Sequence, residues 1–448
     1  MTKSRRGDPN LLMSRREFTA ASAAIGAAAV FASPAMARSR LRGEDVLKVG
    51  LIGCGSRGTG ASVQALQADP GAVLWALGDV FSEKVDSCLG YVKESMLDLD
   101  DEQGTDSWTK KVQVDDSRKF AGLDAVHRVL ASGVDVVLLT TPPGFRPEHL
   151  RASVEAGKHV FCEKPVAVDA AGVRSVLESA RMAKERSLSL MSGFCWRYQD
   201  QVKETFEKLL SGGIGDIHTI QTTYNTTGWV QPNARKEGWS DAEFQLRNWQ
   251  YFTPLSADHV AEQAVHAIDW QAWAMNDRPP LRCFAVGGRQ TRPEIAETGN
   301  VYDHFSIIYE YAGGVRAYHM CRHWPNTPSD NSAYIQGSEG FCTMQPWNGT
   351  HEIEGVNPWK GSAVSNDMYQ REHDVLFKAI RNGEPVNDGV RMSHSSLLAI
   401  MGRMAAYTGQ SVSWEQAMDS KENLNEVEWV LGDRATPTLA IPGKTALI

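Results

Sequence analysis

The sequence predicts an α/β protein with a doubly wound parallel sheet in its first domain and an α+β second domain whose sheet is open and largely antiparallel. Between residues 46 and 198, short apolar strands alternate with helical segments, which is typical of βαβ units. Beyond residue 198 the strands become longer and alternate apolar with polar residues, as antiparallel sheets do. A chain of 448 residues, 42% of them hydrophobic, is long enough to bury two such cores.

Residues 1–37 have the composition of an export leader. Arg15 and Arg16 precede an Ala-rich segment that ends at the small-x-small sequence 35–37. The apolar core, about residues 19–33, is shorter than the roughly 20 residues that a spanning helix needs, so we expect no membrane anchor after leader removal. Paired arginines indicate the twin-arginine route, which exports folded chains, and predict a periplasmic protein.

The first domain, residues 46–198, follows a short polar linker at 38–45. Its first strand is a continuous apolar run, which is typical of a buried parallel strand. Strands are expected at 46–52, 72–77, 112–114, 134–139, 159–162 and 188–191. Helices are expected at 58–68, in the charged stretch up to residue 101, and at 123–132, 148–156 and 170–186.

The second domain, residues 199–448, is predicted to bind substrate and to form an oligomer. A strand is expected at 217–224, and strands 305–311 and 315–321 form a hairpin because Gly313-Gly314 between them favours a tight turn. One continuous helix is expected at about 260–275.

Charge and cysteine content exclude several classes of function. The formal net charge of −8 becomes more negative when the basic leader is removed, which argues against a nucleic-acid partner. The seven cysteines are scattered without a C-x-x-C pair, so we expect free, mostly buried thiols and no metal site.

The first strand runs into a glycine-rich turn that fits G-x-G-x-x-G. Such glycines permit a tight turn, a close approach of the backbone to a pyrophosphate and helix packing on the strand. Asp79 ends the second strand about 20 residues later, where a carboxylate binds a ribose 2′-hydroxyl. These features predict a Rossmann site for NAD, with NADP as the alternative because Arg57 is able to stack on adenine or reach a phosphate. The predicted contacts of the turn are Gly53, Gly55, Ser56, Arg57 and Gly58.

Two further strand ends are predicted to meet the same ligand. Thr141, Pro142 and Pro143 follow the strand at 134–139, and ligands of open α/β sheets lie beyond the carboxyl ends of the strands. The tripeptide Glu163-Lys164-Pro165 follows the strand at 159–162, and its Glu163 and Lys164 are the predicted contacts. A surface turn is the alternative interpretation of this tripeptide.

The chain as a whole resembles the glucose–fructose oxidoreductase/inositol dehydrogenase/rhizopine-catabolism (Gfo/Idh/MocA) family. The resemblance rests on the turn 53–58, on residues 156–160 followed by Glu163-Lys164-Pro165, and on the stretch 402–409. It implies that Lys164 lies between the nicotinamide and the substrate hydroxyl, and that Glu163 contacts the cofactor. It also implies a homo-oligomer built through the open sheet.

The same resemblance points to a D-x-x-x-H signature at Glu262 and His266. Here the Asp has become Glu, and the family's preceding Gly-Gly is missing. Residues i and i+4 share one helix face, so both side chains are expected in one cleft, with Asp269 orienting the imidazole. His266 is the predicted proton acceptor of a carbinol, and a structural histidine is the alternative.

Two other groups of residues carry weaker hints. His319, Cys321 and His323 alternate on one strand face. Because the spacing supplies no fourth ligand, this pattern favours packing or contact with a partner subunit over a metal site. Trp229, Trp239 and Trp249 suggest flat surfaces for a carbohydrate.

The sequence therefore predicts an oxidoreductase that oxidises a carbinol of a sugar or sugar derivative with a tightly bound nicotinamide cofactor. Tight binding is expected because an exported protein must carry its dinucleotide along and restore it in each cycle. A redox-neutral glycoside hydrolase or lyase of the same family is the main alternative, and a noncatalytic sugar-binding protein is the second. Lys164 favours the dehydrogenase, because the glycosidase branch of the family tends to lack it.

Overall fold

The computed structural model describes residues 45–227, 232–292, 295–362, 364–425 and 427–448. The chain divides into two units, Met1–Leu41 and Arg42–Ile448, and all that follows concerns the second. The predicted leader and nearly all of the predicted linker lie outside the described residues. None of the helices in the described part combines the length and the apolar composition needed to cross a bilayer.

The first sheet has six parallel strands in the order β3-β2-β1-β4-β5-β6, the arrangement of a doubly wound dinucleotide-binding domain. Its central strands are apolar because helices cover both faces, and all four residues of β4 are buried. The strands are β1 (Leu47–Ile52), β2 (Ala72–Asp79), β3 (Lys119–Ala121), β4 (Val136–Leu139), β5 (His159–Cys162) and β6 (Leu190–Ser192). The helices between them are α2 (Ser56–Ala68), α3 (Ser82–Gln103), α4 (Ala125–Ala131), α5 (Arg146–Glu155) and α6 (Ala170–Glu185).

The third strand does not lie where the sequence predicted it. Residues 112–114 form only a single bridge, between Val112 and Leu74, and β3 follows at Lys119–Ala121. The reason is local: the Asp115 side chain accepts a hydrogen bond from the Ser117 backbone amide at 2.9 Å. This capped 3-10 turn ends the extended run before it forms a ladder.

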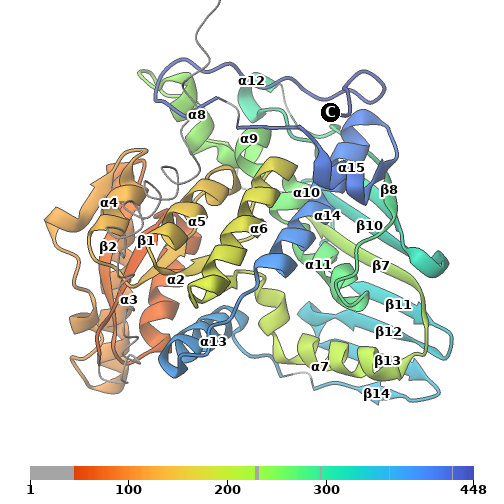
Figure 1. The fold of residues 1–448 in the computed structure, drawn as a ribbon, viewed down its shortest axis with the longest axis horizontal. Coiled ribbons are helices and arrows are strands. Elements are labelled where there is room, and N and C mark those ends of the chain that lie inside the picture. The colour runs from red at the N-terminus through yellow and green to blue at the C-terminus, as the bar shows by residue number, and fades with distance from the viewer. Residues whose placement is uncertain (1–44, 228–231, 293–294, 363, 426) are drawn as a thin grey trace, which may run out of the picture. The chain divides into compact units, whose positions relative to one another are not determined.

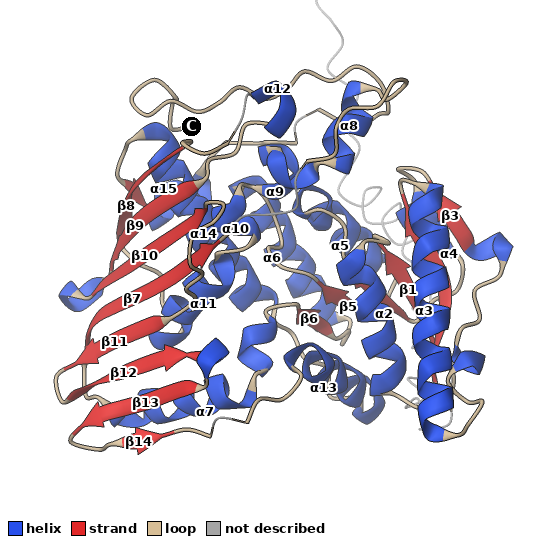
Figure 2. Ribbon diagram, turned by 180° about the vertical axis from the view of Figure 1, so that it is seen from behind, coloured by secondary structure: helices blue, strands red, loops and turns tan. Residues whose placement is uncertain are grey.

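The second sheet has nine strands in the order β14-β13-β12-β11-β7-β10-β9-β8-β15 (Figure 2). All neighbours pair antiparallel except β7 and β10, which run parallel, so the predicted largely antiparallel sheet is confirmed. The expected hairpin is present, with the 3-10 turn Ala312–Gly314 joining its strands. The strands are β7 (Ile217–Thr226), β8 (Arg282–Gly288), β9 (His304–Glu310), β10 (Arg316–His323), β11 (Ala333–Gly337), β12 (Gly340–Gln345), β13 (Thr350–Gly355), β14 (Trp359–Lys360) and β15 (Val412–Ser413).

Helices cover one face of the second sheet, and α11 and α14 pack directly on its strands. The strands show the matching alternation, because every second residue of β10 from Ala317 to His323 is buried. The helices that follow the first domain are α7 (Asp200–Lys208), α8 (Asp241–Arg247), α9 (Thr253–Ser256), α10 (His259–Glu262), α11 (Val265–Ala274), α12 (Ile295–Thr298), α13 (Met368–Asn382), α14 (Gly389–Thr408) and α15 (Trp414–Asp419).

The helix predicted at 260–275 is interrupted, and α10 ends at Glu262 before α11 begins at Val265. A continuous helix requires the Glu262 carbonyl to accept from the His266 amide. Instead the Glu262 carbonyl accepts a hydrogen bond from Lys164 Nζ at 2.5 Å, and the His266 amide donates to Gln263 at 3.2 Å. A side chain from the first domain therefore takes the place of the helical hydrogen bond.

The late part of the chain returns to the first domain. Helix α13 packs against α2 (Figure 1), and residues 386–388 run alongside β6, where the Leu190 amide donates to Val386 at 2.9 Å. The division at residue 198 stays a prediction, and these contacts join both predicted domains. All seven cysteines are free and buried, as expected.

Candidate active site

The glycine-rich turn between β1 and α2 has the geometry of a pyrophosphate cradle. Gly53 has φ of 100°, and a Cβ there would lie 2.7 Å from the backbone of Thr141. A Cβ on Gly58 would lie 2.0 Å from the Gly53 carbonyl oxygen, so α2 packs closely on the turn. A Cβ on Gly55 would meet no described atom within 4 Å, which leaves open space at the start of α2. The turn therefore fits the diphosphate of a dinucleotide.

A cavity of about 290 Å³ lies beside this turn, at the carboxyl ends of β2 and β4. Five of the predicted cofactor contacts line this cavity: Gly53, Gly55, Asp79, Thr141 and Pro142. Ser56, Gly58 and Pro143 are not part of the lining. Ser56 is the exposed first residue of α2, and the buried Pro143 starts a 3-10 turn.

Asp79 holds the turn from the end of β2. Its carboxylate accepts hydrogen bonds from the Cys54 amide at 2.7 Å and from the Phe81 amide at 3.0 Å. Burial raises the pKa of Asp79 above its ordinary value, against the opposing effect of these amides. A carboxylate fixed in this place suits the ribose hydroxyls of NAD.

Arg57 and Glu163, both predicted to contact the cofactor, form an ion pair with each other. Arg57 Nε donates to Glu163 at 2.5 Å, and another of its nitrogens donates to Glu372 of α13 at 2.8 Å. Burial raises the pKa of Glu372, whereas the Arg57 charge overcomes burial at Glu163 and lowers the pKa of that carboxyl. The guanidinium is thus shared by two buried carboxyl groups and does not line the cavity.

Lys164, Glu262 and His266 come together beyond the end of β5. Lys164 Nζ lies 2.5 Å from the Glu262 carbonyl oxygen and 3.6 Å from the Glu262 carboxylate. The His266 ring stacks on Trp196, with centroids 4.9 Å apart. Burial, followed by the positive charges of Lys164 and Arg57, lowers the pKa of His266 well below its ordinary value. The imidazole is therefore neutral near pH 7, the state in which a ring nitrogen has a lone pair for a proton.

The predicted role of Asp269 is wrong. Its carboxylate makes a bidentate ion pair with Arg197, at 2.7 and 2.8 Å, and accepts from Ser395 Oγ at 2.6 Å. These partners use the carboxylate oxygens, and Asp269 fixes the segment that carries Trp196 instead of orienting His266. Among the described residues, His266 Nδ1 is buried without a hydrogen-bond partner. Arg197 lies 72 positions from Asp269 in the sequence, so the spacing of Asp269 and His266 could not reveal this ion pair.

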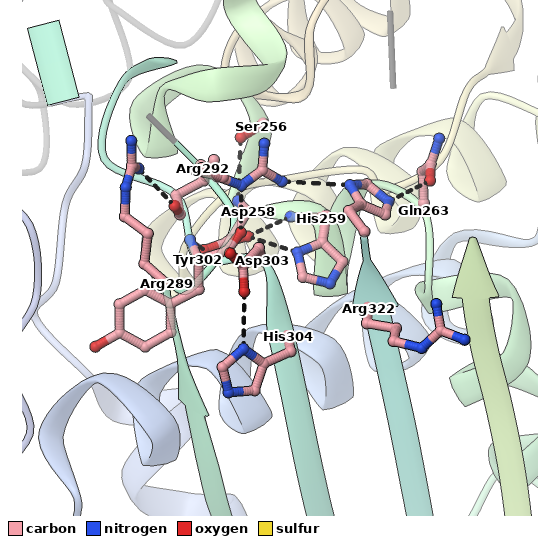
Figure 3. Close-up of polar contacts among 12 residues, drawn as sticks. Ser256, Asp258, His259, Gln263, Arg289, Arg292, Tyr302, Asp303, His304 and Arg322 are labelled. Atoms are coloured by element: carbon pink, nitrogen blue, oxygen red, sulfur yellow. Dashed lines mark hydrogen bonds and ion pairs between the residues drawn. The ribbon is translucent and has the colours of Figure 1, made fainter. Parts of the chain in front are cut away.

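Helix α10 begins on a buried polar cluster, which Figure 3 shows around Asp258. Ala257 and Asp258, just before α10, both have positive φ, 61° and 74°, a conformation that usually requires glycine. The Asp258 carboxylate accepts from the His259 amide at 2.6 Å, the Tyr302 amide at 2.7 Å and the Tyr407 hydroxyl at 2.5 Å. These hydrogen bonds hold the strained start of α10, and so the position of Glu262.

The histidines of β10 pack in the same region, each with a polar side chain of a neighbouring segment as its partner. His319 Nδ1 lies 2.9 Å from Thr222 Oγ1, and His323 Nε2 lies 2.6 Å from Gln263 Oε1. Across the described part of the chain, no three His, Cys, Asp or Glu side chains are grouped to hold a metal ion. Of the three tryptophans suggested for a carbohydrate, Trp239 and Trp249 line the cavity at Asp79, beside the glycine-rich turn, and Trp229 lies outside the described residues.

Buried neutral histidines make stability depend on pH. Burial lowers the pKa of His149, His319 and His373 to about 3, against roughly 6.5 in an unfolded chain. Between pH 6.5 and 3 the unfolded state binds more protons, so the free energy of unfolding falls as pH falls through this window. We expect urea unfolding of His319→Gln to show a pH slope smaller by about 1.4 kcal/mol per pH unit near pH 5. An unchanged slope would contradict this assignment.

Comparisons with known proteins agree with this geometry. Residues 47–194 match the oxidoreductase family with an NAD-binding Rossmann fold, and residues 202–343 match the GFO/IDH/MocA C-terminal domain. A trans-1,2-dihydrobenzene-1,2-diol dehydrogenase of Mus musculus is 26% identical over 284 residues, 59% of this chain and 74% of that protein. The scyllo-inositol 2-dehydrogenase (NADP(+)) of Bacillus subtilis is 29% identical over 154 residues, 33% of this chain and 40% of that protein. The chain spans about half the length of several other curated relatives.

Solved structures show the same fold. A levoglucosan dehydrogenase in complex with NADH and levoglucosan superposes with a TM-score of 0.60 at 18% identity, covering 82% of this chain and 99% of that one. An aldose-aldose oxidoreductase from Caulobacter crescentus, complexed with glycerol, gives 0.61 at 17% identity with the same coverage. The two family matches together cover more than half of the chain. The protein therefore belongs to the Gfo/Idh/MocA family and is an NAD(P)-dependent oxidoreductase.

Proposed function

We propose that the protein oxidises a carbinol carbon of a sugar or sugar derivative. The observation that carries this proposal is the convergence of Lys164, Glu262 and His266 beyond β5, on the same edge of the sheet as the dinucleotide cavity. Similar proteins named for inositol, levoglucosan and aldoses support a polyhydroxylated substrate.

Each of the three residues has a distinct task in this reaction. NAD, when bound, supplies the hydride acceptor. His266, kept neutral by burial and by neighbouring cations, takes the proton of the substrate hydroxyl. Lys164 donates a hydrogen bond to the hydroxyl oxygen, and the Glu262 carbonyl fixes the ammonium in place. This hydrogen bond is the one that replaces the helical hydrogen bond between α10 and α11.

Product analysis tests the proposal. The purified protein is incubated with monosaccharides, polyols and aryl glycosides, and the products are identified by mass spectrometry while cofactor reduction is followed by absorbance. A keto-sugar formed with reduction of the cofactor supports the dehydrogenase. Release of the aglycone without net redox change would instead identify the glycoside hydrolase or lyase. Absence of both products, with sugar bound unchanged, would identify a binding protein.

We also propose that the protein acts in the periplasm with its cofactor retained and recycled. Export is supported by the composition of residues 1–37, in which Arg15 and Arg16 precede an apolar segment as in twin-arginine leaders. Replacing both arginines by lysine is expected to leave the precursor in the cytoplasm, as judged by cell fractionation and immunoblotting. Normal export of this variant would contradict the twin-arginine assignment.

The outer face of the second sheet is proposed to join subunits into a homo-oligomer. Large apolar side chains are exposed there, including Phe284, Val286, Met320 and Phe341. Monomeric proteins rarely expose contiguous apolar surface of this kind. We expect Val286→Asp with Met320→Asp to reduce the molar mass measured by light scattering to that of one chain. Equal masses for wild type and variant would contradict this surface as the interface.

A further inference from the structure

The cavity at Asp79 is not formed by the first domain alone. One wall consists of the glycine-rich turn and the ends of β2 and β4. The opposite wall belongs to residues 236–249 of the second domain, which we call the cap segment. Lys236, Trp239, Leu246, Arg247 and Trp249 of this segment all line the cavity. A second-domain segment thus closes a pocket whose floor is the dinucleotide turn.

Arg247 fastens the cap segment to the first domain. Its guanidinium forms an ion pair with Glu83, in the first turn of α3, at 2.7 Å. The same group lies over the ring of Phe81, 3.8 Å from the centroid, and over Trp239, at 4.8 Å. Phe81 comes two residues after Asp79, so Arg247 joins the cap segment to the loop that carries the ribose-binding carboxylate.

The tail of the chain supports the cap segment from its other side. The Ala242 amide donates to the Gly432 carbonyl at 3.0 Å, and Gln245 Nε2 donates to the Arg434 carbonyl at 3.1 Å. Trp429 belongs to the same buried apolar cluster as Phe244 of the cap segment, and Phe81 packs against this cluster. The cap segment is therefore held between the tail and the first domain.

The position of the cavity identifies the half of the cofactor that it encloses. In this type of sheet, the carboxylate at the end of β2 binds the ribose of the adenosine half, while the reacting half lies near the later strands. The catalytic residues lie at the end of β5, and the cavity lies at β2. Its aromatic walls, Phe81, Trp239 and Trp249, match the flat apolar faces of a purine.

We propose that the cap segment is part of the cofactor site and encloses the adenosine half of NAD, with Arg247 as the latch that slows its dissociation. This inference rests on the proposed function, because it requires NAD in the site. It assigns cofactor retention to second-domain residues that lie outside the dinucleotide-binding turn. It also gives a structural cause for the retention that a periplasmic enzyme requires.

Dissociation of NADH from the full-length mature protein tests this proposal. Bound NADH is displaced by excess NAD in a stopped-flow instrument, and its fluorescence is followed. Arg247→Met removes the ion pair and the contact with Phe81, and about a tenfold faster dissociation is expected. Glu83→Gln removes the ion pair from a residue outside the cavity lining, and about a threefold to fivefold increase is expected. In the double variant, the increase in the dissociation rate is expected to be smaller than the product of the two single increases. The reason is that both substitutions remove the same Arg247–Glu83 ion pair.

Arg235→Met is the matched control. Arg235 lies just outside the cap segment and pairs with Asp241 at 2.5 Å, so its loss breaks an ion pair without detaching the cap segment from the first domain. Dissociation from this variant is expected to stay within about twofold of wild type. If NADH still binds and dissociates at the same rate from Arg235→Met, Glu83→Gln and Arg247→Met, Arg247 does not slow dissociation. The proposed function would be unaffected by that result. If the wild type binds no NADH at all, both proposals fail.

Discussion

Replacing His266 by glutamine is expected to lower kcat by a factor of about 10²–10⁴ while the protein still binds its cofactor. The reason is that glutamine cannot take up the proton that a carbinol must lose. In the structure His266 is neutral, stacks on Trp196 and is close enough to Lys164 for that charge to lower its pKa. The measurement is steady-state turnover on a substrate identified by product analysis, with bound NADH determined by fluorescence.

A buried histidine outside the site provides the control for this experiment. His319 also has a lowered pKa and a hydroxyl partner, Thr222, but it contacts neither Lys164 nor Glu262 in the described contacts. His319→Gln is expected to change kcat by less than about threefold. If His266→Gln retained kcat within tenfold of wild type, His266 would be a structural residue and another group would accept the proton.

Replacing Arg57 by methionine is expected to destabilise the protein by about 3–5 kcal/mol. The substitution removes the cation shared by Glu163 and Glu372, whose side chains are only 5% and 0% exposed. One carboxylate is then left buried without its partner, or must take up a proton at a cost in free energy. The measurement is the free energy of unfolding from urea denaturation at pH 7, provided that unfolding is two-state.

An exposed arginine with two carboxylate partners is the matched control for Arg57. Arg181 on α6 pairs with Glu178 and Glu185, but all three side chains are about half exposed. Arg181→Met is expected to cost less than about 1 kcal/mol. Adding Glu372→Gln to Arg57→Met is expected to recover part of the lost stability, because it removes one buried acid. Equal losses for Arg57→Met and Arg181→Met would show that burial contributes little at Arg57.

The parts of this fold that the sequence predicts are those set by local patterns. The apolar run of β1, the glycines of the following turn and Asp79 at the end of β2 lie within about 30 residues of one another, and their roles follow from backbone chemistry. The strand at 112–114 was predicted wrongly because its apolar residues are followed by Asp115, whose side chain caps a turn. Short apolar runs do not reveal such competition by themselves.

The parts that could not be predicted depend on contacts between distant residues. Glu372 meets Arg57 across 315 positions, and Arg197 meets Asp269 across 72. The periodicity of residues 260–275 indicates one helix, and only the ammonium of Lys164, 98 residues earlier, shows why it is interrupted. Glu262 and His266 were expected to share one face of a continuous helix, but Glu262 ends α10 and His266 belongs to α11.

The return of the chain to β6 has a consequence for how the protein is made. Residues 386–388 run alongside β6, and α13 carries the buried Glu372 that pairs with Arg57. The nucleotide-binding half is therefore incomplete while the ribosome is still translating the second half, an interval on the order of tens of seconds. Folding on the ribosome cannot finish domain by domain, and a chain truncated before residue 368 would release an unfinished nucleotide-binding half. The two halves thus have to be synthesised and folded as one cooperative unit.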